Sequence, residues 1–188
     1  MSCTQTLNGI AKDCAPNMGG VRRVFIGNFE DFVATIAESN NTTRIATIAV
    51  AEGAEGSPKL AKYDFPRGLA SMTSTATIEP TSGAKYFTTE LALQFNRMEA
   101  TKRLEVMALL MADTMVIVED ENGKLWLLDN ENPANVSASD GTTGTAVGDA
   151  NKYGVTLQVM AKELPYEVLR ENIYGDNTAE PVVPPLYD

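Results

Sequence analysis

Apolar and polar residues alternate along several short stretches of the chain, a pattern typical of half-buried β-strands. Residues 21–29 (VRRVFIGNF) show it first, and residues 44–53 (RIATIAVAEG) form a second predicted strand that ends in glycine. Residues 155–161 give a further strand, which stops before Leu164-Pro165. The pattern predicts a chain that is built mainly from β-structure.

The longest predicted strand covers residues 85–95 (KYFTTELALQF). Phe87, Leu91, Leu93 and Phe95 fall largely on one face, because side chains two residues apart share a face of a strand. This apolar face must pack against another surface of the same chain or of a neighbouring one.

Residues 114–130 (TMVIVEDENGKLWLLDN) predict a β-hairpin. The turn falls at Asn122-Gly123, and Asn-Gly between two apolar runs is the strongest short-range hairpin signal. A hairpin also explains the acidic residues at the turn, which do not follow the spacing of an EF-hand calcium loop.

Helical periodicity dominates residues 97–113 (RMEATKRLEVMALLMAD). The expected apolar stripe consists of Ala100, Leu104, Met107 and Met111. After Glu105 the sequence is apolar all round, so we expect this helix end to be covered on more than one side. Either the core of the same chain or a neighbouring subunit could cover it.

The remaining segments lack periodicity. Residues 1–19 are expected to form an N-terminal arm, and residues 53–75, with two prolines, a long loop. Residues 169–188 end in AEPVVPPLYD and are expected to form a tail or an arm extended on a partner. We therefore expect one domain, residues 1–188, with its core in residues 20–168. Its fold class is mainly β (α+β): a β-sandwich or small barrel with one amphipathic helix, extended terminal arms and a long loop.

The net charge of −10 is distributed unevenly. Residues 1–118 contain 12 acidic and 11 basic residues (net −1), whereas residues 119–188 contain 13 acidic and 4 basic residues (net −9). Proteins that grip nucleic acid need Lys and Arg at the phosphates. The acidity therefore indicates either a solubilising surface or a passage through which DNA slides without sticking.

The residues that usually carry catalysis or bind metals are scarce. The chain has no histidine, and Cys3 and Cys14 alone cannot form a four-ligand zinc site. These two cysteines could pair, although free thiols are favoured. The glycine-rich stretch at residues 139–149 lacks the Gly-Lys-Ser/Thr ending of a phosphate-binding loop. We expect no enzyme activity, no cofactor, no metal, no small-molecule ligand and no membrane insertion.

Three stretches carry a resemblance to a known family. They are NGIAKDCAPNMGGVRRVFIGNFEDF (residues 8–32), VIVEDENGKLWLLDNEN (residues 116–132) and SDGTTGTAVGDANKYGVTLQVMAKELPYEV (residues 139–168). Together they resemble the virion structural proteins of tailed phages that infect Bacteroidetes, and most closely the tail tube (major tail) proteins. The resemblance covers most of the chain, and its motifs are structural.

This resemblance implies a function in the virion. Copies of the chain would form hexameric rings, and stacked rings would form a tube whose lumen passes DNA without binding it specifically. Strands of neighbouring subunits would continue one another into an inner β-barrel, and the terminal arms would contact other rings or other virion proteins. The candidate subunit-contact residues are Phe87, Leu91, Leu93, Leu110, Met111, Ser139, Thr142, Thr143, Val182, Val183 and Leu186.

Other interpretations stay open at this stage. The chain could be a head-decoration or head–tail connector protein of the same virion. It could also be a monomeric binding module with a pocket under residues 53–75. The loop expected at residues 137–149 could contact a neighbouring subunit or form a plain surface loop.

Overall fold

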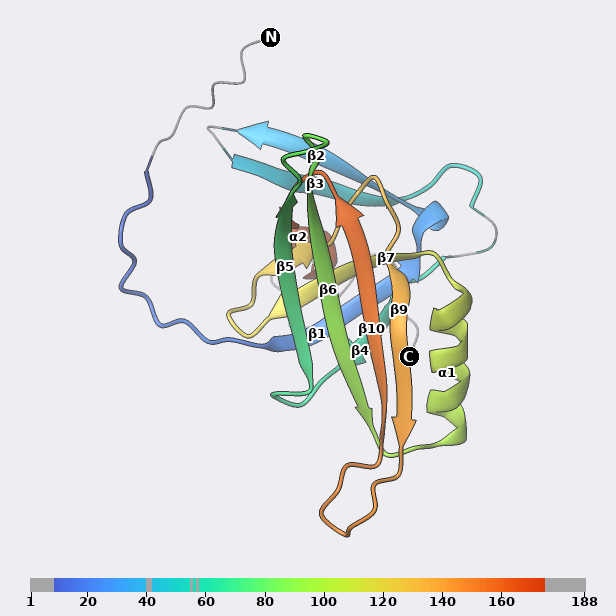
Figure 1. The fold of residues 1–188 in the computed structure, drawn as a ribbon. Helices are drawn as coiled ribbons and strands as arrows, with labels where there is room; N and C mark the ends of the chain where they lie inside the picture. The colour runs from blue at the N-terminus through green and yellow to red at the C-terminus, as the bar shows by residue number, and fades with distance from the viewer. Residues whose placement is uncertain (1–8, 40–41, 55, 57, 175–188) are drawn as a thin grey trace.

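Two β-sheets pack face to face, and one long helix lies along the side of the pair (Figure 1). The structure is a computed structural model that describes residues 9–39, 42–54, 56 and 58–174. The strands of the two sheets cross steeply, as in orthogonal sheet packing (Figure 1). The protein is therefore a mainly β sandwich with a helix, which confirms the predicted fold class.

Sheet A has seven strands in the order β2-β3-β11-β8-β7-β1-β4. Only β3 and β11 pair in parallel; the other neighbours are antiparallel. A short 3-10 helix, η1 (Phe29–Asp31), connects the first two strands in the chain. The strands of sheet A are β1 (Val21–Asn28), β2 (Phe32–Ser39), β3 (Thr42–Val50), β4 (Ala61–Asp64), β7 (Thr114–Asp120), β8 (Leu125–Leu127) and β11 (Tyr166–Val168).

Sheet B has four strands in the order β5-β6-β10-β9, and all neighbours are antiparallel. They are β5 (Ala70–Ile78), β6 (Lys85–Asn96), β9 (Asn135–Thr142) and β10 (Lys152–Ala161). Helix α1 (Ala100–Met111) connects β6 to β7, and the single turn α2 (Glu171–Tyr174) follows β11.

The main core lies between the two sheets. Alternate residues of each strand point into it, such as Val24 and Ile26 of β1 and Leu91 and Leu93 of β6. The side chain of Thr89 is also buried there, and its hydroxyl lies 2.8 Å from that of Ser74 in the neighbouring strand. Burial of these side chains is the main force that holds the sheets together.

A second core covers the outer face of sheet A. Phe25, Ile117 and Leu127 point into it, and Ile173 and Tyr174 of α2 close it. Strand β7 is therefore buried on both faces, which explains why its sequence (TMVIVED) is an apolar run without alternation.

The hairpin predicted at residues 114–130 is confirmed by β7 and β8. Gly123 has φ of 77° in the turn, a conformation that L-residues rarely adopt. The carboxylate of Asp120 accepts hydrogen bonds from the backbone N–H groups of Asn122 and Lys124. These bonds fix the turn between the two strands.

Two stretches that were predicted as loops contain strands. Residues 53–75 hold β4 and six of the nine residues of β5, and residues 137–149 hold most of β9. Pro58 and Pro66 lie outside β4 and do not interrupt it. Strands β5 and β9 escaped prediction because they are rich in Ser and Thr, residues that also mark loops. Strand β4 escaped prediction because it has only four residues and lies between the two prolines.

Helix α1 is present as predicted, but the stripe predicted to be buried is wrong. Val106 and Leu109 are the residues of α1 that enter the core, whereas Leu104 is 64% exposed and Met111 is 83% exposed. Because residues 106–112 are apolar on every side, the sequence did not define which side would face the sandwich.

The two ends of the described chain differ. Residues 9–20 are exposed and contain neither helix nor strand, as expected for an arm, and the backbone N–H of Met18 bonds to the side chain of Asn122 at 2.9 Å. Residues 169–174 belong to the predicted C-terminal arm but pack on sheet A through Ile173 and Tyr174, which corrects this part of the prediction; the rest of the predicted arm lies outside the described residues. Cys14 is an exposed free thiol, and Cys3 lies outside the described residues.

Candidate subunit interface

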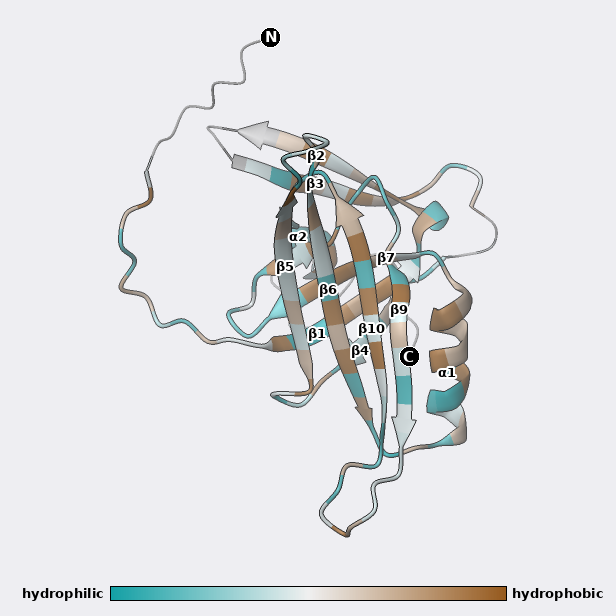
Figure 2. Cartoon of the chain, in the orientation of Figure 1, coloured by the Kyte–Doolittle hydropathy of each residue, from teal (hydrophilic) through white to brown (hydrophobic). Residues whose placement is uncertain are grey.

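The outer face of sheet B is polar. In the strands of this sheet apolar residues alternate with polar ones (Figure 2), and the apolar residues point into the core. The side chains on the other face are mostly small or uncharged: Ser71, Thr73, Thr75, Thr88, Gln94, Thr156 and Gln158. No second layer covers this face in the part of the chain that the structure describes.

The few charges on this face are held by neighbouring side chains. Lys152 donates a hydrogen bond to Gln94 at 2.9 Å, and Gln158 donates one to Glu90 at 3.0 Å. Asp140 of β9 is the other carboxylate on this side of the sheet. The face therefore has no cluster of cations that could grip phosphate groups.

Both edges of sheet B are open within the described residues, because no strand pairs with the outer side of β5 or of β9. Strand β5 (ASMTSTATI) contains no charged residue and no proline. Long edge strands usually carry such residues, because they prevent pairing with another chain. Their absence from β5 leaves an edge that is competent to pair.

The hydrogen-bond pattern shows which groups of β5 face that edge. The backbone N–H of Gln94 bonds to the carbonyl of Leu69 at 2.9 Å, so these two residues form a hydrogen-bonded pair. Bonded and non-bonded pairs alternate along an antiparallel ladder. The backbone groups of Met72, Ser74 and Ala76 therefore point away from β6 and toward the open edge.

Helix α1 adds an apolar surface next to the edge strand β9 (Figure 1). Its exposed residues Leu104, Met107, Leu110 and Met111 are three or four positions apart, so they form one continuous patch. We call these four residues the α1 patch. Exposed apolar patches of this kind mark contact sites between proteins.

The structure separates the candidate contact residues into three groups. Leu91 and Leu93 are buried on the inner face of β6, so the prediction that these two side chains contact another subunit is wrong. Phe87 is half-buried, and its contact with a subunit stays a prediction. Five candidate residues are exposed. Two of them, Leu110 and Met111, belong to the α1 patch. The other three lie on or directly after the edge strand β9: Ser139, Thr142 and Thr143. Val182, Val183 and Leu186 lie outside the described residues.

Sequence reasoning missed the open edge of β5. The available signal was the run of Ser, Thr and Ala at residues 70–77, which alternates without charge and without proline. Threonine favours strands, but the first six residues of this run fell inside the loop predicted at residues 53–75 from its prolines and glycines.

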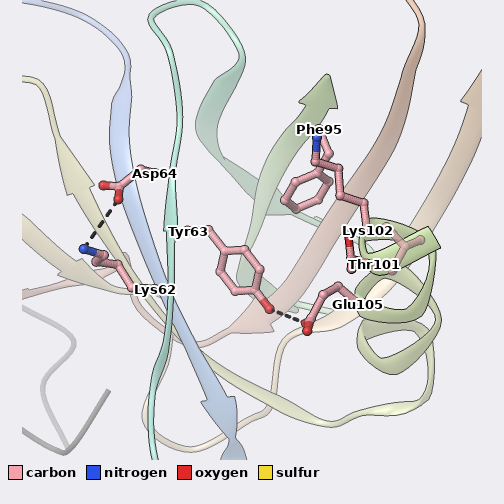
Figure 3. Close-up of a pocket in the computed structure, with 8 residues that line it drawn as sticks. Lys62, Tyr63, Asp64, Phe95, Thr101, Lys102 and Glu105 are labelled. Atoms are coloured by element: carbon pink, nitrogen blue, oxygen red, sulfur yellow. Dashed lines mark hydrogen bonds and ion pairs between the residues drawn. The ribbon is translucent and has the colours of Figure 1, made fainter. Parts of the chain in front are cut away.

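A groove runs between strand β4 and helix α1 (Figure 3). It consists of two adjoining hollows of about 290 and 400 Å³, which share Tyr63 and Glu105. The hydroxyl of Tyr63 donates a hydrogen bond to Glu105 at 3.1 Å, and burial together with this carboxylate raises the pKa of Tyr63. We call this feature the β4–α1 groove.

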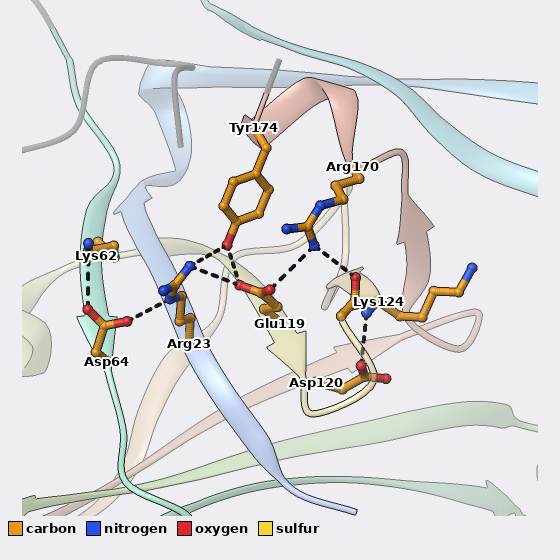
Figure 4. A network of polar contacts seen from close by, with 9 residues as sticks. Arg23, Lys62, Asp64, Glu119, Asp120, Lys124, Arg170 and Tyr174 are labelled. Atoms are coloured by element: carbon orange, nitrogen blue, oxygen red, sulfur yellow. Dashed lines mark hydrogen bonds and ion pairs between the residues drawn. The ribbon is translucent and has the colours of Figure 1, made fainter. Parts of the chain in front are cut away.

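A polar network lies on the other side of β4, over the outer face of sheet A (Figure 4). Its centre is Glu119, which is only 1% exposed; Arg23 and Arg170 approach its carboxylate to 3.8 and 3.5 Å. The hydroxyl of Tyr174 donates a hydrogen bond to the same carboxylate. Burial and this bond raise the pKa of Tyr174 to about 12. The network holds α2 against sheet A.

Comparisons with known proteins identify no relative: no family model, no curated protein and no solved structure matches the chain. Among the described residues, no helix is both long enough and apolar enough to cross a membrane. The same residues bring together no group of three Cys, Asp or Glu side chains that could hold a metal ion.

Proposed function

We propose that the protein is a tail tube subunit of a tailed-phage virion. Its copies associate through the edges of sheet B into hexameric rings, and the rings stack around a lumen that conducts DNA. The observation that carries this proposal is a four-stranded sheet with a polar outer face and with two edges that no described strand pairs with, one of which lacks any charge or proline.

The topology of sheet B suits a ring. Because it has four strands that are all antiparallel, its two edge strands run in opposite directions. Pairing β5 of one copy with β9 of the next therefore continues the antiparallel pattern, the more stable kind of pairing. The two strands have similar lengths, nine and eight residues. Such a head-to-tail contact closes into a ring when the rotation between copies allows it.

The outer face of sheet B suits a DNA passage. Six copies, the number implied by the resemblance to tail tube proteins, would place 24 strands (six times four) around the lumen. With strands about 4.8 Å apart and tilted by about 40°, such a barrel is roughly 50 Å wide between backbones. Its lining of Ser, Thr and Gln side chains would let DNA pass without holding its phosphates.

The test is electron microscopy of the purified protein over a concentration series, with the mass measured by light scattering. We expect rings or tubes with an open lumen to replace the monomer as the concentration rises. A monomer of 20.2 kDa at every concentration would overturn the proposal. Isolated rings that never stack would instead favour the connector function.

A pair of variants tests the edge contact itself. Ala76→Pro removes a backbone N–H that faces the open edge, without removing a hydrogen bond to β6. Ala76→Val keeps this N–H and serves as the matched control. We expect Ala76→Val to assemble and Ala76→Pro to stay monomeric with an unchanged circular dichroism spectrum. Assembly of Ala76→Pro at the wild-type concentration would exclude β5 from the interface.

A further inference from the structure

We infer that residues 175–188 dock in the β4–α1 groove of their own chain. This inference goes beyond the proposed function, because it concerns the folded monomer and holds whether or not the chain assembles.

The groove has an apolar and aromatic floor. Tyr63 and Phe95 lie edge to face with their ring centres 5.9 Å apart, and Val106 and Leu109 of α1 continue the apolar surface. Aromatic grooves of this kind bind proline-rich segments, because proline holds the ligand in an extended conformation before it binds.

Positive charge dominates the rim of the groove. Lys59, Lys62 and Lys102 line it, against the two carboxylates of Asp64 and Glu105. Lys62 lies 3.6 Å from Asp64 and Lys102 lies 3.4 Å from Glu99, and Asp64 also pairs with Arg23 at 2.7 Å. Ion pairs between solvent-accessible side chains are weak, so these lysines can exchange their partner for a carboxylate of a ligand. In a chain with net charge −10, this rim is a site for an acidic ligand.

Residues 175–188 (GDNTAEPVVPPLYD) have the matching chemistry. They contain Asp176, Glu180 and Asp188 but no lysine or arginine, and PVVPPL supplies prolines with apolar side chains between them. Carboxylates on both sides of PVVPPL match lysines at the rim of an apolar groove.

The segment also starts beside the groove. The hydroxyl of Tyr174 lies 3.0 Å from Arg23, and Arg23 lies 2.7 Å from Asp64, which lines the groove (Figure 4). The six residues 175–180 reach at most roughly 20 Å when extended. This length lets PVVPPL enter the groove of the same chain, and the short connection favours its own groove over that of a second copy.

Zero-length carbodiimide cross-linking of the full-length chain tests this inference, because it joins a carboxylate to a lysine only when they touch. The reaction is run on an equal mixture of ¹⁴N- and ¹⁵N-labelled protein at a concentration where light scattering shows monomers. We expect mass spectrometry to find Glu180 or Asp188 joined to Lys59, Lys62 or Lys102 in peptides of a single label.

A variant pair shows whether the apolar part of the segment drives docking. Replacing Val182, Val183 and Leu186 by serine removes three apolar contacts and is expected to lower the yield of these cross-links at least about tenfold. The matched control Val147→Ser changes a fully exposed valine and should leave the yield unchanged.

Three results would overturn the inference. Cross-links that carry mixed labels would place the segment in the groove of a neighbouring copy. Links to distant lysines such as Lys12 and Lys162 in equal yield would show that the contact is not specific to the groove. The absence of any link would show that the segment does not dock. Because the reaction is run on monomers, failure of the proposed assembly would leave its outcome unaffected.

Discussion

The carboxylate of Glu119 shows how single residues hold the outer layer of sheet A. It is almost fully buried, yet Arg23, Arg170 and Tyr174 all reach it. A buried charge is tolerated only when partners of opposite charge and hydrogen bonds compensate for the loss of water. The sequence marked Glu119 only as part of a hairpin, because its partners lie far away along the chain.

Removing this carboxylate should destabilise the fold. We expect Glu119→Ala to lower the free energy of unfolding by about 3 kcal/mol, because it leaves Arg23 and Tyr174 without their buried partner. Glu119→Gln keeps an acceptor for Tyr174 and should cost about 1–2 kcal/mol. Urea unfolding measures both. The control is Glu131→Ala, which breaks the exposed pair with Lys162 and should lower the free energy of unfolding by less than about 1 kcal/mol. If Glu131→Ala and Glu119→Ala destabilised the protein equally, burial of Glu119 would not explain its effect.

Tyr174 predicts how stability changes at alkaline pH. Its pKa in the fold is about 12, whereas an unperturbed tyrosine titrates near pH 10. Because the pKa is raised by folding, its contribution is complete below about pH 10 and is lost as the pH rises toward about 12. The free energy of unfolding should therefore fall more steeply over this range in the wild type than in Tyr174→Phe, by up to about 2 kcal/mol. The free energy of unfolding is measured by urea unfolding at each pH. If it fell equally with pH in the wild type and in Tyr174→Phe, the prediction would be refuted.

Among the elements, α1 departs most from its sequence prediction. The stripe expected in the core is largely exposed, and the α1 patch lies beside the edge strand β9. Helical spacing correctly indicated a helix, but spacing cannot choose between two apolar sides. That choice depends on which side chains fit between the sheets, and Val106 and Leu109 occupy that place.

The α1 patch should affect assembly more than folding. We expect Met111→Glu to change the free energy of unfolding by no more than about 0.5 kcal/mol, because the residue is exposed. The same change should raise the concentration at which rings form at least about tenfold, because a charge would be buried in the contact. Val106→Ala is the comparison: it should cost about 2 kcal/mol in urea unfolding. Rings of Met111→Glu at the wild-type concentration would remove the α1 patch from the interface.

Other elements show where local pattern is sufficient. The hairpin of β7 and β8 was predictable because Asn122-Gly123 defines its turn locally. Strand β4 was not, because it depends on pairing with β1, about 40 residues earlier in the chain. Strand β5 was not, because its small Ser, Thr and Ala residues follow a stretch with prolines and glycines, although it pairs with the next strand, β6. The open edges of sheet B, which define the candidate interface, become visible only once the strand order is known.

For the whole molecule, the distribution of charge differs from the sequence expectation. The acidic second half indicated either a solubilising surface or an acidic passage for DNA, but the outer face of sheet B, the proposed lining, is mostly neutral. Several acidic residues of that half instead form ion pairs on sheet A, such as Glu119 and Glu167. A mostly neutral lining also avoids holding DNA. The proposed lumen therefore depends on the lack of a cation cluster on this face among the described residues.

This property predicts the effect of adding cations to the lining. We expect assembled wild-type protein to retain no DNA in a filter-binding assay. Thr88→Lys combined with Thr156→Lys places two lysines on the outer face of sheet B, and these assemblies should retain DNA at about 50 mM salt and release it by about 200 mM. The control combines Thr143→Lys with Thr145→Lys, because both threonines are exposed and lie outside the strands of sheet B. Equal retention by both variants would show that this face does not line the lumen.

The position of β11 in sheet A has a consequence for how the chain folds. This strand of three residues lies between β3 and β8, and it pairs with residues more than 120 positions earlier, such as Glu167 with Arg44. During synthesis, the β2–β3 hairpin therefore cannot join the rest of sheet A until residues 166–168 have left the ribosome. Contacts this distant in sequence slow folding. The final step of folding is thus tied to completion of the chain, and an unfinished chain cannot complete sheet A.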